Sequence, residues 1–126
     1  MAPTAFAPDY RAFKSAIIGQ ESSGRYGAVN PSSGAMGIGQ QMPQTAQTLA
    51  GRLNLPWNPS LMTGTTPEAQ KYQDALTEAA TREAWNAGQG DPATAAMYYH
   101  GGSNRAKWGP KTQQYARNIL GRLGGN

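Results

Sequence analysis

The chain has 126 residues, the length of a single domain, of which 38% are hydrophobic, 9% aromatic and 14% charged. This apolar content supports one modest core, and the low charge density excludes a coiled coil and a charge-driven disordered chain. Eleven Lys and Arg against seven Asp and Glu give a net charge of +4 without any basic run. That pattern argues against a dedicated nucleic-acid binder and suits a polyanionic partner.

The chain contains no cysteine and a single histidine, His100. A disulfide framework, a thiolate metal site, a cysteine nucleophile and a multi-histidine zinc site are therefore excluded, and we expect no metal and no cofactor. No apolar run reaches the length of a membrane span, so no membrane insertion is expected. Residues 1–8 lack the basic start and the continuous apolar stretch of a signal peptide.

Glycine and proline divide the first half of the sequence into short helical segments. Asp9 has the side chain of a helix N-cap and predicts a first helix that runs to about Glu21. Residues 22–39 are rich in Gly, Ser, Asn and Pro, which predicts an ordered loop or turn series. Pro43 suits the first position of a second helix that reaches about Leu53. Residues 54–66 then form a connection interrupted by prolines.

A long helix is predicted over residues 67–87, because its apolar positions recur at helical spacing. These positions are Tyr72, Leu76, Ala79, Ala80 and Ala84. On another face we expect charged pairs at i,i+3 and i,i+4, namely Glu68 with Lys71 and Glu78 with Arg82.

The remainder of the chain is predicted to be helical as well. Asp91 caps a short helix over residues 92–99, a Gly-rich loop follows, and a last helix covers residues 111–123. No alternating run of β-branched and aromatic residues is long enough for a strand. The predicted class is therefore all-α, with at most a minor β element, in a single domain of residues 1–126 with its core at about 8–122.

The seven carboxylates differ in how well a structural role explains them. Asp9 and Asp91 are explained as helix caps, and Glu83 lies near the edge of the apolar stripe of the long helix. Three others, Glu68, Asp74 and Glu78, fall on the solvent side of that helix.

Glu21 is the carboxylate that points to chemistry. It continues the stripe of Phe13 and Ile17 at i, i+4 and i+8, within about 80° on a helical wheel. Apolar surroundings and the negative end of the helix dipole both favour the neutral acid, so we expect a raised pKa for Glu21. A carboxylic acid that stays protonated near neutral pH can donate a proton to a leaving oxygen. The alternative is that Glu21 only ties down its loop by hydrogen bonds.

Four sequence blocks, in order along residues 10–122, resemble the soluble lytic transglycosylase family. The first is Glu-Ser-Ser-Gly at residues 21–24, and the second is Gly-Ala-Met-Gly-Ile-Gly-Gln-Gln-Met-Pro at residues 34–43. The third is Met-Tyr-Tyr-His-Gly-Gly at residues 97–102, and the fourth is Tyr115 in the last helix. Asn86-Ala87-Gly88 spells a similar triplet, but it lacks the Asn-x-x-Lys-Trp stretch that follows residues 97–102.

The resemblance implies a lysozyme-like helical fold and an enzyme that acts on peptidoglycan. Such an enzyme cleaves the β-1,4 bond between N-acetylmuramic acid and N-acetylglucosamine, consumes no water and leaves a 1,6-anhydro ring. By resemblance, Glu21 is the acid that protonates the leaving oxygen and then the base toward the muramyl O6 hydroxyl. One carboxylate is enough for this reaction, whereas a water-using glycosidase typically needs two.

The resemblance also implies substrate-binding residues in the first loop. Gln40 offers a donor and an acceptor for an acetamido group or a ring hydroxyl, and Met42 corresponds to a cleft wall, although a lone Met is more often in the core. The serine of the family pattern has candidates in Asn30, Ser32 and Ser33, of which we carry Ser32 forward. The glycines at positions 34, 37 and 39 allow close approach of the backbone to a sugar, or simply form tight turns.

Three further substrate-binding residues are implied in the last third of the chain. Tyr99 and Tyr115 can each place a ring face on a sugar while the hydroxyl forms a hydrogen bond; the alternative for Tyr115, which lies near the catalytic acid in the family, is packing on a helix face. His100 stands where the family usually has Asn. It either contacts substrate and adds a pH dependence, or it is bonded to loop backbone.

The setting implied by the resemblance is a bacteriophage. The small size, the absence of a secretion signal and the Tyr-His-Gly-Gly variant are similar to wall-degrading domains of phage virion proteins, delivered by the particle or by host lysis onto periplasmic peptidoglycan. Expected partners are glycan strands and other virion proteins, and the Gly-rich residues 123–126 resemble a linker.

Two alternatives remain open. One is a lysozyme-type hydrolase on the same fold, which needs a water-positioning group such as Glu83 or Asp91. The other is a non-catalytic wall-binding or virion module, against which the presence of Glu21 argues.

Overall fold

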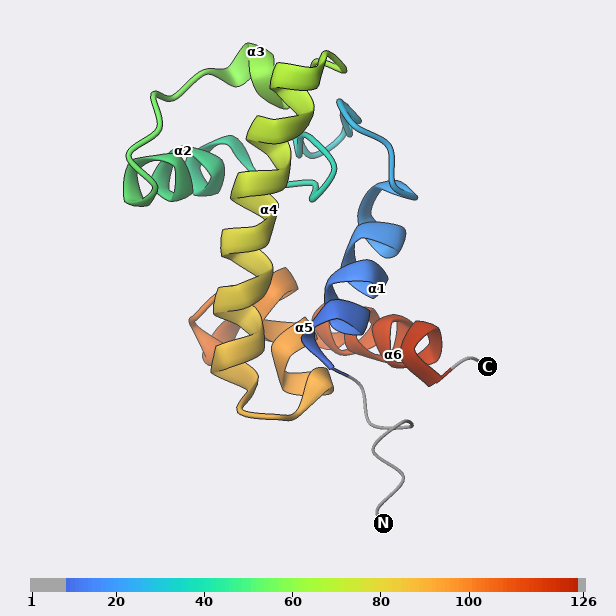
Figure 1. Cartoon of the computed structure of the whole chain (residues 1–126). Coiled ribbons are helices and arrows are strands. Elements are labelled where there is room, and N and C mark those ends of the chain that lie inside the picture. Colours follow the sequence, from blue (N-terminus) through green and yellow to red (C-terminus); the bar gives the residue numbers. More distant parts are fainter. Residues whose placement is uncertain (1–8, 125–126) are drawn as a thin grey trace. The chain divides into compact units, whose positions relative to one another are not determined.

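The computed structural model describes residues 9–124 (Figure 1). Residues 1–8, on which the signal-peptide prediction rests, and residues 125–126 of the predicted linker lie outside the described part. The helices of the described part, in chain order, are α1 (Tyr10–Ser22), α2 (Pro43–Arg52), α3 (Pro59–Met62), α4 (Pro67–Gly88), α5 (Pro92–Gly101), the 3-10 helix η2 (Arg105–Lys107) and α6 (Pro110–Gly124).

The all-α prediction is confirmed. The described residues contain no β-strand and only two isolated antiparallel bridges, from Met36 to Val29 and from Met36 to Gln41. None of the helices found within residues 9–124 has both the length and the hydropathy that crossing a membrane requires.

Side-chain caps and prolines set the helix starts, as the sequence predicts. Asp9 Oδ1 accepts a hydrogen bond from Ala12 N at 2.8 Å, and Asp91 Oδ1 accepts one from Ala93 N at 3.2 Å. Helix α3 was not predicted, although Asn58 caps it by accepting from Ser60 N and Pro59 occupies its first turn. The helix has only four residues, too few to show a hydrophobic period. The Asn58-Pro59 pair was therefore the only local signal for it, and that pair alone does not distinguish a helix start from a turn.

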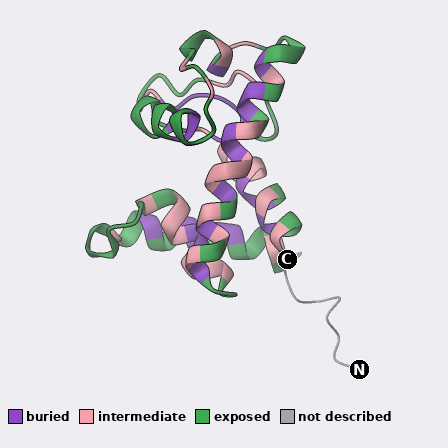
Figure 2. Ribbon diagram, turned by 60° about the vertical axis from the view of Figure 1, so that its left-hand side comes forward, coloured by how far each residue is buried: buried purple, intermediate pink, exposed green. Residues whose placement is uncertain are grey.

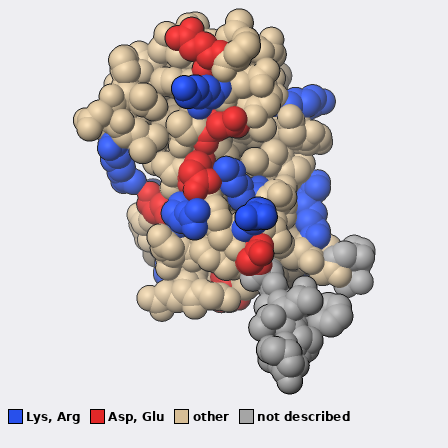
Figure 3. All heavy atoms as spheres, in the orientation of Figure 1, with Lys and Arg blue, Asp and Glu red and all other residues tan. Residues whose placement is uncertain are grey.

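The chain folds as two compact units. Within the described residues, unit 1 combines residues 9–20 with residues 81–124, and unit 2 consists of residues 21–80. Helices α1 and α4 each contribute residues to both units. Lys and Arg side chains are intermingled with Asp and Glu on the face shown in Figure 3, in keeping with the absence of a basic run in the sequence.

The core of unit 1 is built where α1, α4, α5 and α6 supply buried apolar residues (Figure 2). Phe13, Ile17 and Ile119 are fully buried, and the ring of Trp85 lies 5.2 Å from that of Phe13. Small residues allow the end of α4 to approach α5 closely in this core. A Cβ added to Gly88 would lie only 2.8 Å from the Cβ of Ala95. Helices α5 and α6 pack directly against each other in this unit.

Unit 2 has its own apolar cluster around α2 and α4, with Leu49, Met62, Tyr72 and Leu76 buried. Gln73, fully buried, lies beside this cluster and uses both ends of its amide. Its Oε1 accepts from the backbone N–H groups of Gly27 and Ile38, each at 3.0 Å. Its Nε2 donates to the carbonyls of Leu61 at 2.8 Å and Gly64 at 3.0 Å. One side chain thus joins helix α4 to the loop of residues 23–42, to α3 and to the chain that follows α3.

Candidate functional site

Glu21 is the penultimate residue of α1 and belongs to unit 2. Phe13 and Ile17 on the same helix face are fully buried, as the spacing predicts, and Glu21 itself is half-buried. The apolar stripe therefore ends in a carboxylate that keeps partial access to solvent. Glu21 is thus neither fully exposed on the surface nor fully buried in the core.

The neighbouring Ser22 fastens this end of α1 to the second sequence block. Its buried Oγ donates a hydrogen bond to the carbonyl of Ile38 at 2.7 Å. The Glu-Ser pair and the Gly-rich block are therefore in direct contact in unit 2, although the bonded residues are 16 positions apart in the chain. The sequence pattern assigned no role to Ser22, whose buried hydroxyl holds the end of α1 against the Gly-rich block in the structure.

The Gly-rich block is a series of tight turns held by backbone and side-chain bonds. Gly34 and Gly37 have φ values of +85° and +81°, so both lie in turns whose backbone conformation favours glycine. Gly37 is also sterically confined, because an added Cβ would lie 3.3 Å from Gln73 Oε1 and 3.2 Å from Met62 Cε. The amide of Gln73 thus fixes the turn that precedes Gln40.

Gln40 has a left-handed backbone conformation, with φ of +50°. Its Nε2 donates to the carbonyls of Ala28 and Gly37, each at 3.0 Å. Both amide hydrogens of this side chain are therefore used within the loop, and Oε1 is the atom left for another molecule. We expected Gln40 to offer substrate both a donor and an acceptor. In this structure only its acceptor, Oε1, is left for that purpose.

Ser32 and its neighbours form a side-chain-capped turn. Asn30 Oδ1 accepts from the backbone N–H groups of Ser32 at 2.9 Å and Ser33 at 3.3 Å, and Ser33 Oγ accepts from Ala35 N at 3.1 Å. All three candidates for the family serine are exposed; Asn30 and Ser33 use their side-chain oxygens in the turn, whereas Ser32 takes part through its backbone N–H. Met42, just before α2, is 46% exposed and is not a core residue.

The candidates of the last third of the chain lie in unit 1, on α5 and α6. His100 is in the last turn of α5, which extends two residues beyond the predicted end. Its Nδ1 lies 3.0 Å from Thr112 Oγ1, and its ring stacks on that of Tyr115 with centroids 4.7 Å apart. The alternative that His100 is bonded to loop backbone is therefore wrong, because its hydrogen-bond partner is a side chain of α6.

Tyr115 and Tyr99 are more enclosed than His100. Tyr115 is 7% exposed and belongs to the core cluster of unit 1, which supports the packing interpretation for most of its ring. Tyr99 is half-buried against the same cluster. Burial lowers the pKa of His100 below its ordinary value, so the imidazole is neutral at pH 7.

The other carboxylates have structural partners in several cases. Thr94 donates to Asp91 Oδ2 at 2.5 Å, which lowers the pKa of Asp91. Tyr98 donates to Glu83 Oε2 at 2.6 Å. Tyr26 donates to Asp74 Oδ1 at 2.8 Å, and this bond raises the pKa of the Tyr26 hydroxyl. Among residues 9–124, no group of three His, Cys, Asp or Glu residues is arranged to hold a metal ion.

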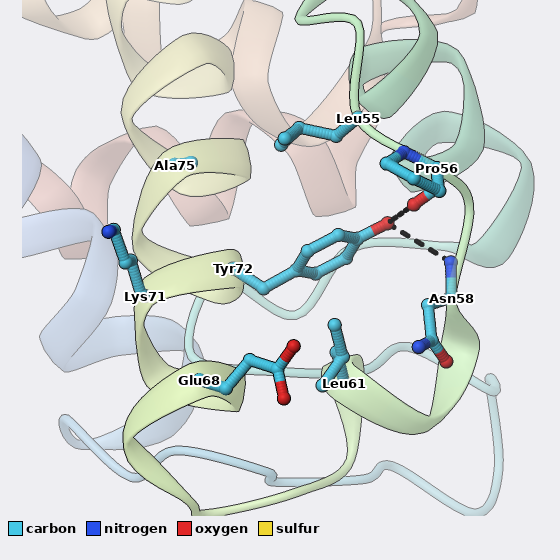
Figure 4. A pocket seen from close by; sticks show the side chains of 8 residues that line it. All are labelled: Leu55, Pro56, Asn58, Leu61, Glu68, Lys71, Tyr72 and Ala75. Carbon is cyan, nitrogen blue, oxygen red and sulfur yellow. Dashed lines mark hydrogen bonds between the residues drawn. The ribbon is translucent and has the colours of Figure 1, made fainter.

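A cavity of about 350 Å³ lies in unit 2, between α4 and the connection that contains α3 (Figure 4). None of the catalytic or substrate-binding candidates selected from the sequence lines it, although Glu68, Lys71 and Tyr72 of the predicted long helix do. Its walls come from residues 55–61 and 68–75, which the sequence pattern treated as a connection and as part of a long helix. No local signal could have found it, because the cavity exists only once these two segments are folded together.

Two comparisons with known proteins found similarity to transglycosylases. The family model described as "Transglycosylase SLT domain" matches residues 10–120. A protein named "Transglycosylase" from Enterobacteria phage PRD1 is 33% identical over 108 residues, which is 82% of this chain and 34% of the relative. The chain thus spans about a third of the length of that relative. No solved structure is significantly similar to the chain.

Proposed function

The chain belongs to the transglycosylase SLT domain family, and on this premise we propose that it is a peptidoglycan lytic transglycosylase. The bond cleaved is the β-1,4 linkage between N-acetylmuramic acid and N-acetylglucosamine, and the product carries a 1,6-anhydro ring. The observation that carries the proposal is the Ser22–Ile38 hydrogen bond, which joins the end of α1, with its carboxylate, to the Gly-rich block.

Glu21 is the proposed catalytic residue. Its carboxyl group donates a proton to the glycosidic oxygen, which leaves as the 4-hydroxyl of N-acetylglucosamine. The carboxylate then accepts the proton of the muramyl O6 hydroxyl as that oxygen bonds to C1 and closes the ring. The proton count balances without water, so a single carboxylate suffices.

Ser32, Gln40 and Met42 are the proposed substrate-binding residues of unit 2. The exposed Ser32 can offer its hydroxyl, Gln40 its Oε1 and Met42 its exposed thioether face. In unit 1 the proposed residues are Tyr99, His100 and Tyr115. Stacking on Tyr115 fixes the orientation of the His100 ring, which leaves Nε2 as the nitrogen for a sugar hydroxyl.

The hydrolase alternative has no support from the carboxylates that it requires. Asp91 caps α5, and Glu83 is bonded to Tyr98. Both groups therefore have structural roles that account for them. The one-carboxylate mechanism fits this division of roles better than a mechanism that needs a second carboxylate for water.

The biological setting is proposed from the relative. Since that protein comes from a phage and the match covers 34% of its length, we propose that this chain supplies a wall-degrading function to a phage particle or to host lysis. Its partner is then the glycan strand of periplasmic peptidoglycan, with other virion proteins as neighbours.

The test is the activity of Glu21→Gln on purified peptidoglycan, with Glu83→Gln as the matched control. We expect Glu21→Gln to lose at least about a hundredfold in rate with an unchanged thermal melt, because a general acid contributes about 10²–10⁴-fold. Glu83→Gln keeps an acceptor for Tyr98 and should retain most activity. Wild-type products analysed by mass spectrometry should be anhydromuropeptides. Products heavier by one water would identify a hydrolase, and a Glu21→Gln variant with normal activity would refute the assignment.

A further inference from the structure

The cavity in unit 2 has apolar walls and one carboxylate directed into it. Leu55, Pro56 and Leu61 form one side, and the ring of Tyr72 and the methyl group of Ala75 on α4 form the other. In Figure 4 the Glu68 carboxylate extends from the first turn of α4 toward Leu61, below the Tyr72 ring. The volume of about 350 Å³ is at the small end of the range for ligand sites in proteins.

The Tyr72 ring is a fixed wall of this cavity. Its hydroxyl donates to the carbonyl of Pro56 at 2.7 Å and accepts from Asn58 N at 3.1 Å. These bonds hold the ring across the gap between α4 and the connection, so the cavity does not depend on a mobile side chain. A cation placed over the ring face would also be attracted by its π electrons.

The charge of Glu68 is not neutralised by a neighbour in the described part of the chain. Lys71 also lines the cavity, but in Figure 4 its side chain lies on the other side of α4 from the Glu68 carboxylate, and the predicted pair of Glu68 with Lys71 is not formed. No hydrogen bond or ion pair joins the Glu68 carboxylate to another side chain of residues 9–124. Glu68 is exposed at the mouth of these apolar walls, and a ligand that combines an apolar body with a positive charge complements them.

We propose that this cavity binds the protonated side-chain amine of a diamino acid within a peptide. The methylene chain lies against Leu61 and the Tyr72 ring, and the ammonium group pairs with Glu68. In the peptidoglycan setting, which rests on the proposed function, this group is the free amine of an uncross-linked peptide stem. The cavity then binds the peptide stem of the substrate, while Glu21 acts on its glycan strand.

Binding can be measured by NMR titration of the full chain, whose mass is 13.4 kDa. The probes are the capped tripeptide acetyl-Ala-Lys-Ala-amide and the same peptide with norleucine, which lacks the amine. We expect the lysine peptide to shift amide signals of residues 55–61 and 68–75 and to bind about tenfold more tightly than the norleucine peptide. Equal binding of the two peptides, or an absence of shifts in these segments, would overturn the proposal.

Two neighbouring charge variants test the role of Glu68. Glu68→Gln should reduce binding of the lysine peptide to the level of the norleucine peptide. Lys71→Gln, made one turn away on the same helix, should bind at least as tightly as the wild type because it removes a repelling charge. Unchanged binding by Glu68→Gln, with its spectrum still that of a folded protein, contradicts the proposal.

Wall digestion separates this inference from the proposed function. Glu68→Gln should raise KM on stem-bearing peptidoglycan and leave KM unchanged on strands whose stems have been removed by an amidase. Glu21→Gln should be inactive on both substrates yet bind the lysine peptide normally. If Glu21→Gln is inactive but Glu68→Gln digests both substrates like the wild type, the stem-reading role fails while the transglycosylase assignment stands.

Discussion

Gln73 makes an unusually large contribution, for a single polar side chain, to the order of unit 2. It is fully buried and satisfies two backbone donors and two backbone acceptors, which belong to Gly27, Ile38, Leu61 and Gly64. A hydrocarbon of the same shape would leave all four groups without these bonds. Each buried unpaired group costs about 1–3 kcal/mol.

We therefore expect Gln73→Leu to lower the free energy of unfolding by about 4 kcal/mol or more. Gln70→Leu, one turn earlier on the same helix, is the matched control because the Gln70 side chain makes an exposed bond to the Thr65 carbonyl. Urea unfolding followed by circular dichroism measures both. A Gln73→Leu variant as stable as Gln70→Leu would show that water or loop movement satisfies the four groups.

His100 links α5 to α6 through Thr112 and Tyr115, and burial lowers its pKa. The unfolded chain therefore binds the proton more readily than the folded protein does. The stability that this group contributes is complete above its ordinary pKa of 6.5 and is lost as the pH falls from there toward the lower folded value.

The measurement is the thermal melt of wild type and His100→Asn at about pH 8 and about pH 5. We expect the wild type to lose more stability than the variant over this range. Asn can still bond to Thr112 but does not titrate. The carboxylates titrate equally in both proteins, so the difference between the two melts reports the imidazole alone. Equal losses of stability in the two proteins would show that His100 does not contribute to the pH dependence of stability.

The burial and bonding of single residues could be predicted from the sequence only where a local pattern exists. The apolar stripe that ends in Glu21 follows from helical spacing, and Phe13 and Ile17 are buried as that spacing predicts. Gln73 looks like an ordinary helix-surface glutamine, because its burial is decided by loops that are distant in the chain. The use of both Gln40 amide hydrogens inside the loop was hidden for the same reason.

At the scale of elements, α5 carries two of the proposed substrate-binding residues, Tyr99 and His100, and its start depends on a single cap. Asp91 accepts from Ala93 N and from Thr94 Oγ1. Removing an N-cap oxygen typically costs about 1 kcal/mol.

Asp91→Ala should accordingly lower the free energy of unfolding by about 1 kcal/mol, while Asp91→Ser, which keeps a capping oxygen, should lose only a small part of that. Denaturant unfolding at neutral pH compares them. If the two variants are equally stable, the start of α5 is held by Pro92 and tertiary packing instead of by the side-chain cap.

The element boundaries were largely predictable because they depend on residues with strong local preferences. Asp9, Asp91 and the prolines at positions 43, 67 and 92 mark helix starts within a residue of those observed. The C-terminal ends are less well marked. Helix α5 continues through His100 to Gly101, where close packing against the Trp108 ring favours a residue without a side chain.

For the molecule as a whole, the net charge of +4 matters for association with an anionic wall. The positive charges are dispersed, and residues 92–126 contain no carboxylate side chain while they carry Arg105, Lys107, Lys111, Arg117 and Arg122. Long-range attraction of this kind is screened beyond about 10 Å at roughly 0.1 M salt.

We expect the rate of wall digestion at low substrate to fall severalfold when salt rises from about 0.01 M to about 0.2 M, with little change in kcat. Arg105→Gln combined with Lys107→Gln, both exposed in η2, should flatten this dependence. Turbidity clearing at several wall concentrations separates KM from kcat. A salt effect confined to kcat would mean that screening acts on the chemical step and not on the encounter.

The amide of Gln73 also limits how this protein can be redesigned. Two donors and two acceptors at the end of a three-bond stem are a combination that glutamine alone supplies among the natural side chains, since asparagine is a methylene shorter and glutamate lacks the hydrogens. A combinatorial library that randomises α4 should consequently return glutamine at this one position in almost every clone that still folds, whatever else has drifted around it.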